Sequence, residues 1–389
     1  MPFTRSVITF SCFIALTSLR LYGQASASSS QPQPDVLIFT NGEKLIGHLE
    51  SATGSSVVFK SDMAGEVTVD WAKIQELHSS RKFAAIPKGT RLRNRQDAAK
   101  VPQGAVTMTG QQIKVSPSAP GAPQTFPVGS VGNLVEGTAF EKAFERTSFF
   151  HGWRGGATGG ISLTEATQKN QTYTAALNLT RSVPDVNWLD LRSRTLFDLN
   201  EAYGKLSEPG TPDVKTSLFH AGLEQDWYLS PRVFAFAHGL WDHSFSQGLD
   251  LQQIYGPGLG FVVFKRANEE LDLKVSADYI NQRYAEQQLL PPPAPPEPSR
   301  SLSLFGTTFG ETYTRTFAHG IFLNQQAGIT PTWNDLDAYF AFASAALTFP
   351  VYHRFGLTLG ALDSFLNNPP PTFKKNSFQF TAGATYSFQ

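Results

Sequence analysis

The chain has 389 residues, enough for two or three domains. Its 32 basic and 32 acidic residues cancel, so no overall charge attracts it to nucleic acid, and no nucleic-acid partner is expected. Charged residues make up only 16% of the chain, against about 25% in soluble domains, while aromatic residues reach 12%. After the first residues, no apolar run reaches the roughly 18 residues of a membrane-spanning helix, so the composition favours a barrel that is apolar on alternate residues.

Residues 1–27 predict a secretory signal peptide. Val7–Leu19 is largely apolar, and an Ala-Ser-Ala sequence at 25–27 offers a cleavage site of small residues. A membrane anchor is the weaker interpretation, because the apolar run is short and Arg20 interrupts it. The only cysteine, Cys12, lies inside this segment, so we expect no disulfide in the exported protein.

Residues 35–80 predict a small SH3-like or Sm-like β module. Asp35–Phe39 and Lys44–Leu49 alternate in polarity and are joined by an Asn-Gly turn, which is a strong signal for a β-hairpin. Short strands are also predicted at Val57–Lys60 and Glu66–Asp70. Several short strands this close together are typical of a small barrel.

A second, looser β module is predicted over residues 86–137, followed by a linker at 138–151. Thr68–Leu77 aligns with Thr125–Leu134, with apolar residues at corresponding positions, although chance similarity between two short strands is an alternative. A loop rich in Pro, Gly and Ala at Ser116–Pro123 interrupts this module. Peptidoglycan or a periplasmic protein is the partner expected for the SH3-like module at residues 35–80.

Residues 152–389 predict an antiparallel, 12-stranded transmembrane β-barrel of the outer membrane. Segments of about ten residues alternate between apolar and polar side chains and are separated by turn residues. An even number of strands is what bacterial single-chain barrels require. The predicted strands are Trp153–Leu163, Thr172–Arg181, Trp188–Asn200, Ser217–Tyr228, Val233–Phe245, Gln253–Phe264, Leu271–Gln282, Leu302–Arg315, Ile321–Thr332, Tyr339–Phe349, Phe355–Leu366 and Ser377–Phe388.

The connections between the predicted strands alternate in length. Ser182–Val186 and Leu229–Arg232 are short, whereas Glu201–Thr216 and Tyr284–Ser301 are long. Short turns of outer-membrane barrels face the periplasm, so both termini are expected there. The proline-rich stretch Pro291–Pro298 cannot pair in a sheet and is expected at an exposed loop tip.

The last predicted strand carries the clearest barrel pattern. Phe378, Phe380, Tyr386 and Phe388 share one face, and Ser, Thr, Gln and Gly share the other. Aromatic residues near both ends of a strand fit the girdles found at membrane interfaces. These four residues also form the predicted signal for the barrel-assembly machinery, which we expect as a partner in addition to outer-membrane lipid.

Two predicted strands carry charged residues on a single face. A charge on the lipid face costs about 2–4 kcal/mol at the midplane, so these side chains are predicted to line the lumen. Opposite charges interleave, which favours a lumen sealed by ion pairs over a narrow channel for small solutes, the main alternative. The lumen-lining candidates are Asp190, Arg192, Arg194, Asp198, Asp272, Lys274 and Asp278.

No catalytic residue, metal site or cofactor is predicted. The consecutive residues Asp242, His243 and Ser244 have the side chains of a catalytic triad, but on a strand His243 points away from its two neighbours. Gly256–Gly260 lacks the helix and lysine of a phosphate loop and is interpreted as a strand where bulk is not tolerated. We expect a non-enzymatic protein, and a lipid-modifying enzyme embedded in the barrel is a further alternative.

Several of these segments are similar to the salt-induced outer membrane protein family, whose function is unknown. The similarity lies in Leu229–Phe234, Gly256–Gly260 and Asn368–Asn376, and it extends over roughly residues 153–388. Asn41–Gly47 resembles the small β module that often precedes such barrels. The resemblance implies an outer-membrane location and a structural role or a link to salt or osmotic stress, and it supplies no catalytic residues.

Overall fold

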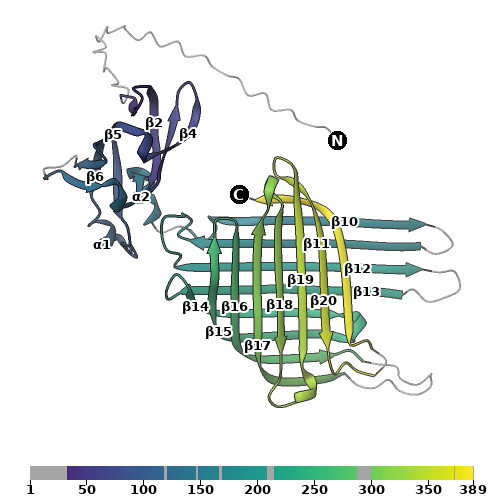
Figure 1. The fold of residues 1–389 in the computed structure, drawn as a ribbon. Coiled ribbons are helices and arrows are strands. Elements are labelled where there is room, and N and C mark those ends of the chain that lie inside the picture. Colours follow the sequence, from purple (N-terminus) through teal and green to yellow (C-terminus); the bar gives the residue numbers. More distant parts are fainter. Residues whose placement is uncertain are drawn as a thin grey trace, which may run out of the picture.

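A computed structural model of the chain shows an N-terminal β module followed by a closed barrel (Figure 1). The structure describes residues 33–117, 121–145, 148–165, 169–207, 214–286, 299–371 and 373–388. The predicted signal peptide and the proline-rich stretch Pro291–Pro298 lie outside these residues. Within the described part of the chain, no helix is both long enough and apolar enough to cross a bilayer.

The N-terminal module is one antiparallel sheet with the strand order β4-β3-β2-β1-β5-β6-β7-β8, and β9 pairs with both β2 and β5. The predicted Asn-Gly turn joins β1 to β2, with Gly42 at a φ of 87°. Its strands are β1 (Asp35–Phe39), β2 (Lys44–Thr53), β3 (Ser56–Ser61), β4 (Gly65–Asp70), β5 (Ile74–Pro87), β6 (Gln103–Thr109), β7 (Gln112–Ser116), β8 (Gln124–Pro127) and β9 (Val131–Glu136). Two short helices, α1 (Arg95–Ala98) and α2 (Gly137–Ala143), complete it.

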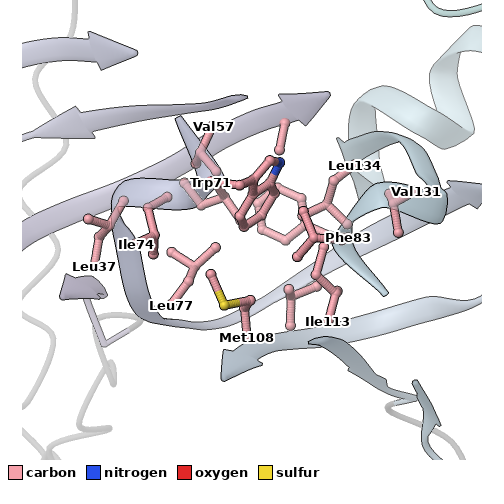
Figure 2. Close-up of a cluster of buried hydrophobic side chains, with 14 of the residues drawn as sticks. Leu37, Val57, Trp71, Ile74, Leu77, Phe83, Met108, Ile113, Val131 and Leu134 are labelled. Carbon is pink, nitrogen blue, oxygen red and sulfur yellow. The ribbon is translucent and has the colours of Figure 1, made fainter. Parts of the chain in front are cut away.

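The two predicted N-terminal modules share a strand and a core. The boundary placed between residues 80 and 86 falls inside β5, which runs from one half of the module into the other. Leu77 from the first half and Met108 and Ile113 from the second pack around Trp71 in one buried cluster (Figure 2). One shared core removes more apolar surface from water than two separate small cores would, which explains the continuous sheet.

Residues 153–388 form a closed antiparallel barrel of twelve strands, so the predicted fold and all twelve strands are confirmed. The first strand pairs with the last, with Gly155 opposite Phe388, and this pairing closes the barrel. The strands are β10 (Trp153–Glu165), β11 (Lys169–Val183), β12 (Ser193–Ser207), β13 (Val214–Tyr228), β14 (Val233–Ser244), β15 (Leu249–Arg266), β16 (Glu269–Tyr284), β17 (Arg300–Thr316), β18 (Phe322–Thr330), β19 (Phe340–Tyr352), β20 (Phe355–Leu366) and β21 (Asn376–Phe388).

Side chains of the barrel alternate between its outer surface and its lumen. In β21, Phe378 and Phe380 are exposed on the outside, while Thr385 is buried within the barrel. Large apolar residues such as Leu259 and Phe309 are exposed on the outer surface of other strands. Because such residues would be costly to hydrate, this surface is suited to lipid.

The N-terminal module docks on the turn between β11 and β12, at the end of the barrel where the chain terminates (Figure 1). The ring of Trp188 stacks on Phe140 of α2, with centroids 5.7 Å apart. Arg192 Nη1 donates a hydrogen bond to the carbonyl oxygen of Arg93 at 3.1 Å. Arg93 Nη2 in turn donates to the carbonyl oxygen of Leu229, in the next turn at this end, at 3.4 Å. Stacking and hydrogen bonds therefore join the module to two turns of the barrel.

Glu136 caps the helix that carries Phe140. Its carboxylate accepts hydrogen bonds from the backbone N–H of Ala139 and from the hydroxyl of Thr138, both at 3.0 Å. Partial burial opposes ionisation, but these hydrogen bonds to the carboxylate outweigh it and hold the pKa of Glu136 below its ordinary value. The cap fixes where α2 begins, and this determines where Phe140 meets the barrel.

We expect Trp188→Ala to loosen the docking of the module by about 2 kcal/mol, because it removes a stacked and partly buried ring. In the full-length protein in micelles, amide hydrogen exchange of α2 should accelerate. Trp333→Ala is the matched control, since Trp333 is exposed at the other end of the barrel, and it should leave α2 unchanged. Equal protection of α2 in the Trp188→Ala variant and the wild type would show that the stack does not hold the module.

Candidate functional site in the barrel lumen

The pairing register decides which side chains meet inside the barrel. Inward positions of β12 to β16 carry the charged residues, and Arg194 lies opposite Asp226 on the neighbouring strand. Inward positions of β19 to β21 and of β10 are mostly small, and Thr158, Thr358 and Thr385 are examples. One half of the lumen is therefore filled by long charged side chains, and the other half is lined by short neutral ones.

Arg194 is the centre of the charged half. Its guanidinium lies 2.7 Å from Asp226, 2.8 Å from Asp272 and 3.1 Å from Glu270. The Arg194 side chain is 11% exposed and that of Asp226 is fully buried. A guanidinium has five N–H donors in a planar fork, so one arginine can bind three carboxylates from two strands. The aromatic ring of Phe234 lies 5.5 Å from the same guanidinium.

A second ion pair lies beside this cluster. Lys274 Nζ is 2.5 Å from Glu224, and both side chains are largely buried. Lys274 also lies over the ring of Phe236, 5.8 Å from its centroid. Phe234 and Phe236 are buried on β14. This strand pairs with β13, which carries Glu224 and Asp226. We call Arg194, its three carboxylates, the Lys274–Glu224 pair and these two rings the lumen plug.

Three glycines of β15 make room for the plug and for its neighbour Asp278. A β-carbon on Gly258 would lie 2.3 Å from the Phe236 ring, and one on Gly260 would lie 2.1 Å from the Phe234 ring. At Gly256 it would lie 1.9 Å from Asp278 Oδ1. The prediction that Gly256–Gly260 is a strand where bulk is not tolerated is confirmed.

Histidine–aspartate pairs lie deeper in the lumen, beyond the plug. His220 is held between Asp242, 2.5 Å from Nδ1, and Asp198, 2.8 Å from Nε2. His238 Nε2 lies 2.9 Å from the buried carboxylate of Asp278. Asp278 also accepts hydrogen bonds from the hydroxyls of Ser276, at 2.9 Å, and Thr308. The buried carboxylate of Asp278 thus has three donors, as burial of a charge requires.

A second group of side chains fills the far end of the charged half. Gln282 Nε2 donates to Gln252 at 2.7 Å and Tyr284 donates to Gln282 at 3.0 Å. Gln247 reaches across the barrel and donates to the carbonyl oxygens of Ser364 and Lys375, each at 3.0 Å. A cavity of about 190 Å³ lies between the two halves of the lumen and extends toward this end, where Gln247 lines it.

The structure places five of the seven predicted lumen residues inside the barrel. Arg194 and Asp272 meet in the plug, Lys274 pairs with Glu224, and Asp198 and Asp278 pair with histidines.

Asp190 and Arg192 do not lie on a barrel strand, contrary to the prediction. The strand predicted to begin at Trp188 begins at Ser193, and the preceding residues form the turn on which the module docks. Leu189 and Leu191 alternate with Asp190 and Arg192, so the local pattern imitates a strand. Trp188 and Leu189 instead pack against the apolar cluster that contains Phe140 of α2. Arg192 accordingly binds the module through Arg93.

The lumen residues His220, Glu224 and Asp226 of β13 were not predicted, although the alternation of this strand indicates them. In β13 every second residue from His220 to Asp226 is polar or glycine, and the alternate positions on the other face include Phe219, Leu223 and Trp227.

The three consecutive residues Asp242, His243 and Ser244 bind different partners. Asp242 pairs with His220, His243 Nδ1 lies 2.9 Å from the carbonyl oxygen of Asp250, and Ser244 contacts the hydroxyl of Ser246 at 3.2 Å. These contacts are not those of a catalytic triad, in which the hydroxyl and the carboxylate both bind the same imidazole. In the part of the chain that the structure describes, no group of three or more His, Cys, Asp or Glu side chains could hold a metal ion.

A closed antiparallel barrel with an even number of strands, an apolar exterior and a polar, charged interior defines a transmembrane barrel of the outer-membrane type. The family model described as "Protein of unknown function, DUF481" matches residues 157–388, and the chain belongs to this family. No curated protein matches the chain.

Two solved barrels are among those similar to the chain. The translocator domain of the autotransporter NalP from Neisseria meningitidis is 10% identical, with a TM-score of 0.34, over 64% of this chain and 92% of that one. The COG4313 outer membrane channel from Pseudomonas putida F1 is 12% identical, with a TM-score of 0.33, over 63% of this chain and 100% of that one. The class of this protein rests on its own strand topology and surface, not on these distant similarities.

We expect Gly258→Val to destabilise the barrel by about 3 kcal/mol, because the added side chain overlaps the Phe236 ring and the backbone behind it. The folded fraction can be measured by the gel shift between heated and unheated protein after refolding in micelles. Leu259→Val changes the neighbouring lipid-facing residue and should refold like the wild type. Normal refolding of Gly258→Val would mean that the rings can move aside.

Arg194→Met should cost about 3–5 kcal/mol of unfolding free energy, because it leaves the carboxylates of Asp226 and Asp272 buried without their cation. Urea unfolding in lipid vesicles, followed by tryptophan fluorescence, measures this loss. Arg154→Met breaks an exposed ion pair with Asp185, whose side chains are 64% and 39% exposed, and should cost about 0–1 kcal/mol. Equal losses in the two variants would contradict a central role for Arg194.

Proposed function

We propose that this protein is a sealed, non-enzymatic barrel of the outer membrane that holds a β module in the periplasm. The observation that carries the proposal is the lumen plug, which fills the charged half of the lumen at the end near the module. Arg194 contacts three carboxylates there, and Phe234 and Phe236 are buried beside it. These side chains pair with each other and are largely buried, so they should block the path of a passing solute.

The proposed orientation places both termini and the module in the periplasm. The connections at the module end include the two-residue turns 267–268 and 353–354. Those at the other end include 331–339 and 367–375, which are longer. Short turns on the periplasmic side and longer loops outside are the usual arrangement of such barrels, and this supports the orientation.

The proposed role is structural, or connected to salt or osmotic stress. The second possibility is supported by the resemblance to the salt-induced outer membrane protein family in segments such as Leu229–Phe234. The partners proposed with it are outer-membrane lipid, the barrel-assembly machinery at the last strand, and peptidoglycan or a periplasmic protein at the module.

A sealed barrel should give no single-channel steps in planar bilayers. Steady steps from the wild type would contradict the proposal and favour a narrow channel. The double variant Phe234→Ala/Phe236→Ala shortens two plug side chains and should allow ion current. Phe305→Ala/Phe309→Ala, which removes two exposed rings from the outer surface, is the matched control and should stay silent.

The enzymatic alternative is tested on the same refolded protein. We expect no release of fatty acid from phospholipid vesicles, and sustained release that depends on the protein would contradict a non-enzymatic barrel.

A further inference from the structure

The cavity of about 190 Å³ inside the barrel is lined by acidic side chains without a described lysine or arginine beside them. Its charged lining residues are Asp198 and Asp242 together with His220 and His243. Among the lining residues that the structure describes, none is a lysine or an arginine. Since the cations of the plug are engaged with other carboxylates, the charge of Asp198 and Asp242 is balanced mainly by His220.

His220 cannot fully balance these two carboxylates. Both ring nitrogens face a carboxylate oxygen, and donating to both at once requires the doubly protonated imidazolium, which carries a single positive charge. Two carboxylates and one imidazolium leave an excess negative charge in the cavity. Asp242 Oδ2 also accepts a hydrogen bond from the neutral amide of Gln252 at 3.1 Å, which adds no positive charge. The side chains of Asp198 and Asp242 remain 24% and 26% exposed, so a ligand can reach them.

The rest of the lining offers a different chemistry. An apolar wall near Asp242 is formed by Leu240 and Ile254. Ile254 belongs to a buried apolar cluster, and Leu240 packs against that cluster. Asn324 also lines the cavity, and its Oδ1 has no hydrogen-bond partner among the residues that the structure describes. An acceptor of this kind suits an N–H donor of a ligand.

We propose that this cavity binds a small organic cation, an alkylammonium whose charged group lies at Asp198 and Asp242 and whose alkyl part lies against Leu240 and Ile254. An anion would face uncompensated carboxylates, and a neutral solute would leave their excess charge unpaired. The volume is below the roughly 300 Å³ at which pockets for drug-sized ligands begin, so the ligand has only a few heavy atoms. This site goes beyond the proposed function, because a sealed barrel needs no ligand.

The test compares three probes of similar size and different charge. n-Propylammonium, 1-propanol and propionate are titrated by calorimetry into the full-length protein in neutral detergent at constant ionic strength. We expect saturable binding of n-propylammonium alone. Equal binding of all three, or no binding of n-propylammonium, would overturn the proposal, as would sodium ions displacing it at equal concentration.

Variants separate the site from the rest of the barrel. Asp242→Asn keeps the shape of the side chain and should weaken n-propylammonium binding about tenfold or more, since a charged hydrogen-bond partner is lost. Asn200→Lys places an ammonium group on the strand position opposite His220 and should abolish binding. Asp250→Asn changes a carboxylate that pairs with Arg283 and should bind like the wild type. Unchanged affinity in correctly folded Asp242→Asn and Asn200→Lys would contradict the assigned site.

Discussion

Lipid offers no partner to a charged side chain, and this constraint determines the interior of the barrel. Strand alternation gives each residue one of two faces, and the charges of the plug lie on the lumen face, where side chains of other strands satisfy them. Arg194 shows the outcome, since it binds Asp226 from the neighbouring strand and Asp272 and Glu270 from β16. Ion pairs in the lumen therefore tie together strands that are not adjacent in the sheet.

The same constraint explains why the two halves of the lumen differ. The charged half also holds the large rings of the plug, and these side chains need space. The inward glycines of β15 supply it for Phe234, Phe236 and Asp278. The opposite half uses short side chains that bond to each other, as in a row of threonine hydroxyls from Thr348 through Thr358 and Thr385 to Thr158, separated by 2.9, 2.5 and 2.8 Å. A large half packed against a small half leaves the cavity between them.

Most of the barrel could be predicted from the sequence because a two-residue period is a local property. The face occupied by Asp272 or Phe378 follows from counting along one strand. The hydrogen-bond partner of a lumen side chain cannot be found by counting along one strand. His220 lies between Asp198 and Asp242 because β12, β13 and β14 pair in one particular register. The start of β12 could not be predicted from the local pattern either. Residues from Trp188 to Arg192 alternate like a strand, but they form a turn that contacts the module.

The docking turn connects the module directly to the plug. Trp188 and Arg192 contact the module, β12 begins at Ser193, and Arg194 is the next residue. The backbone of Arg192 is itself held on both sides, by a hydrogen bond from its N–H to Val183 and one to its carbonyl oxygen from Tyr228, both at 2.9 Å. The contacts that dock the module and the ion pairs of the plug therefore come from neighbouring residues at the start of β12.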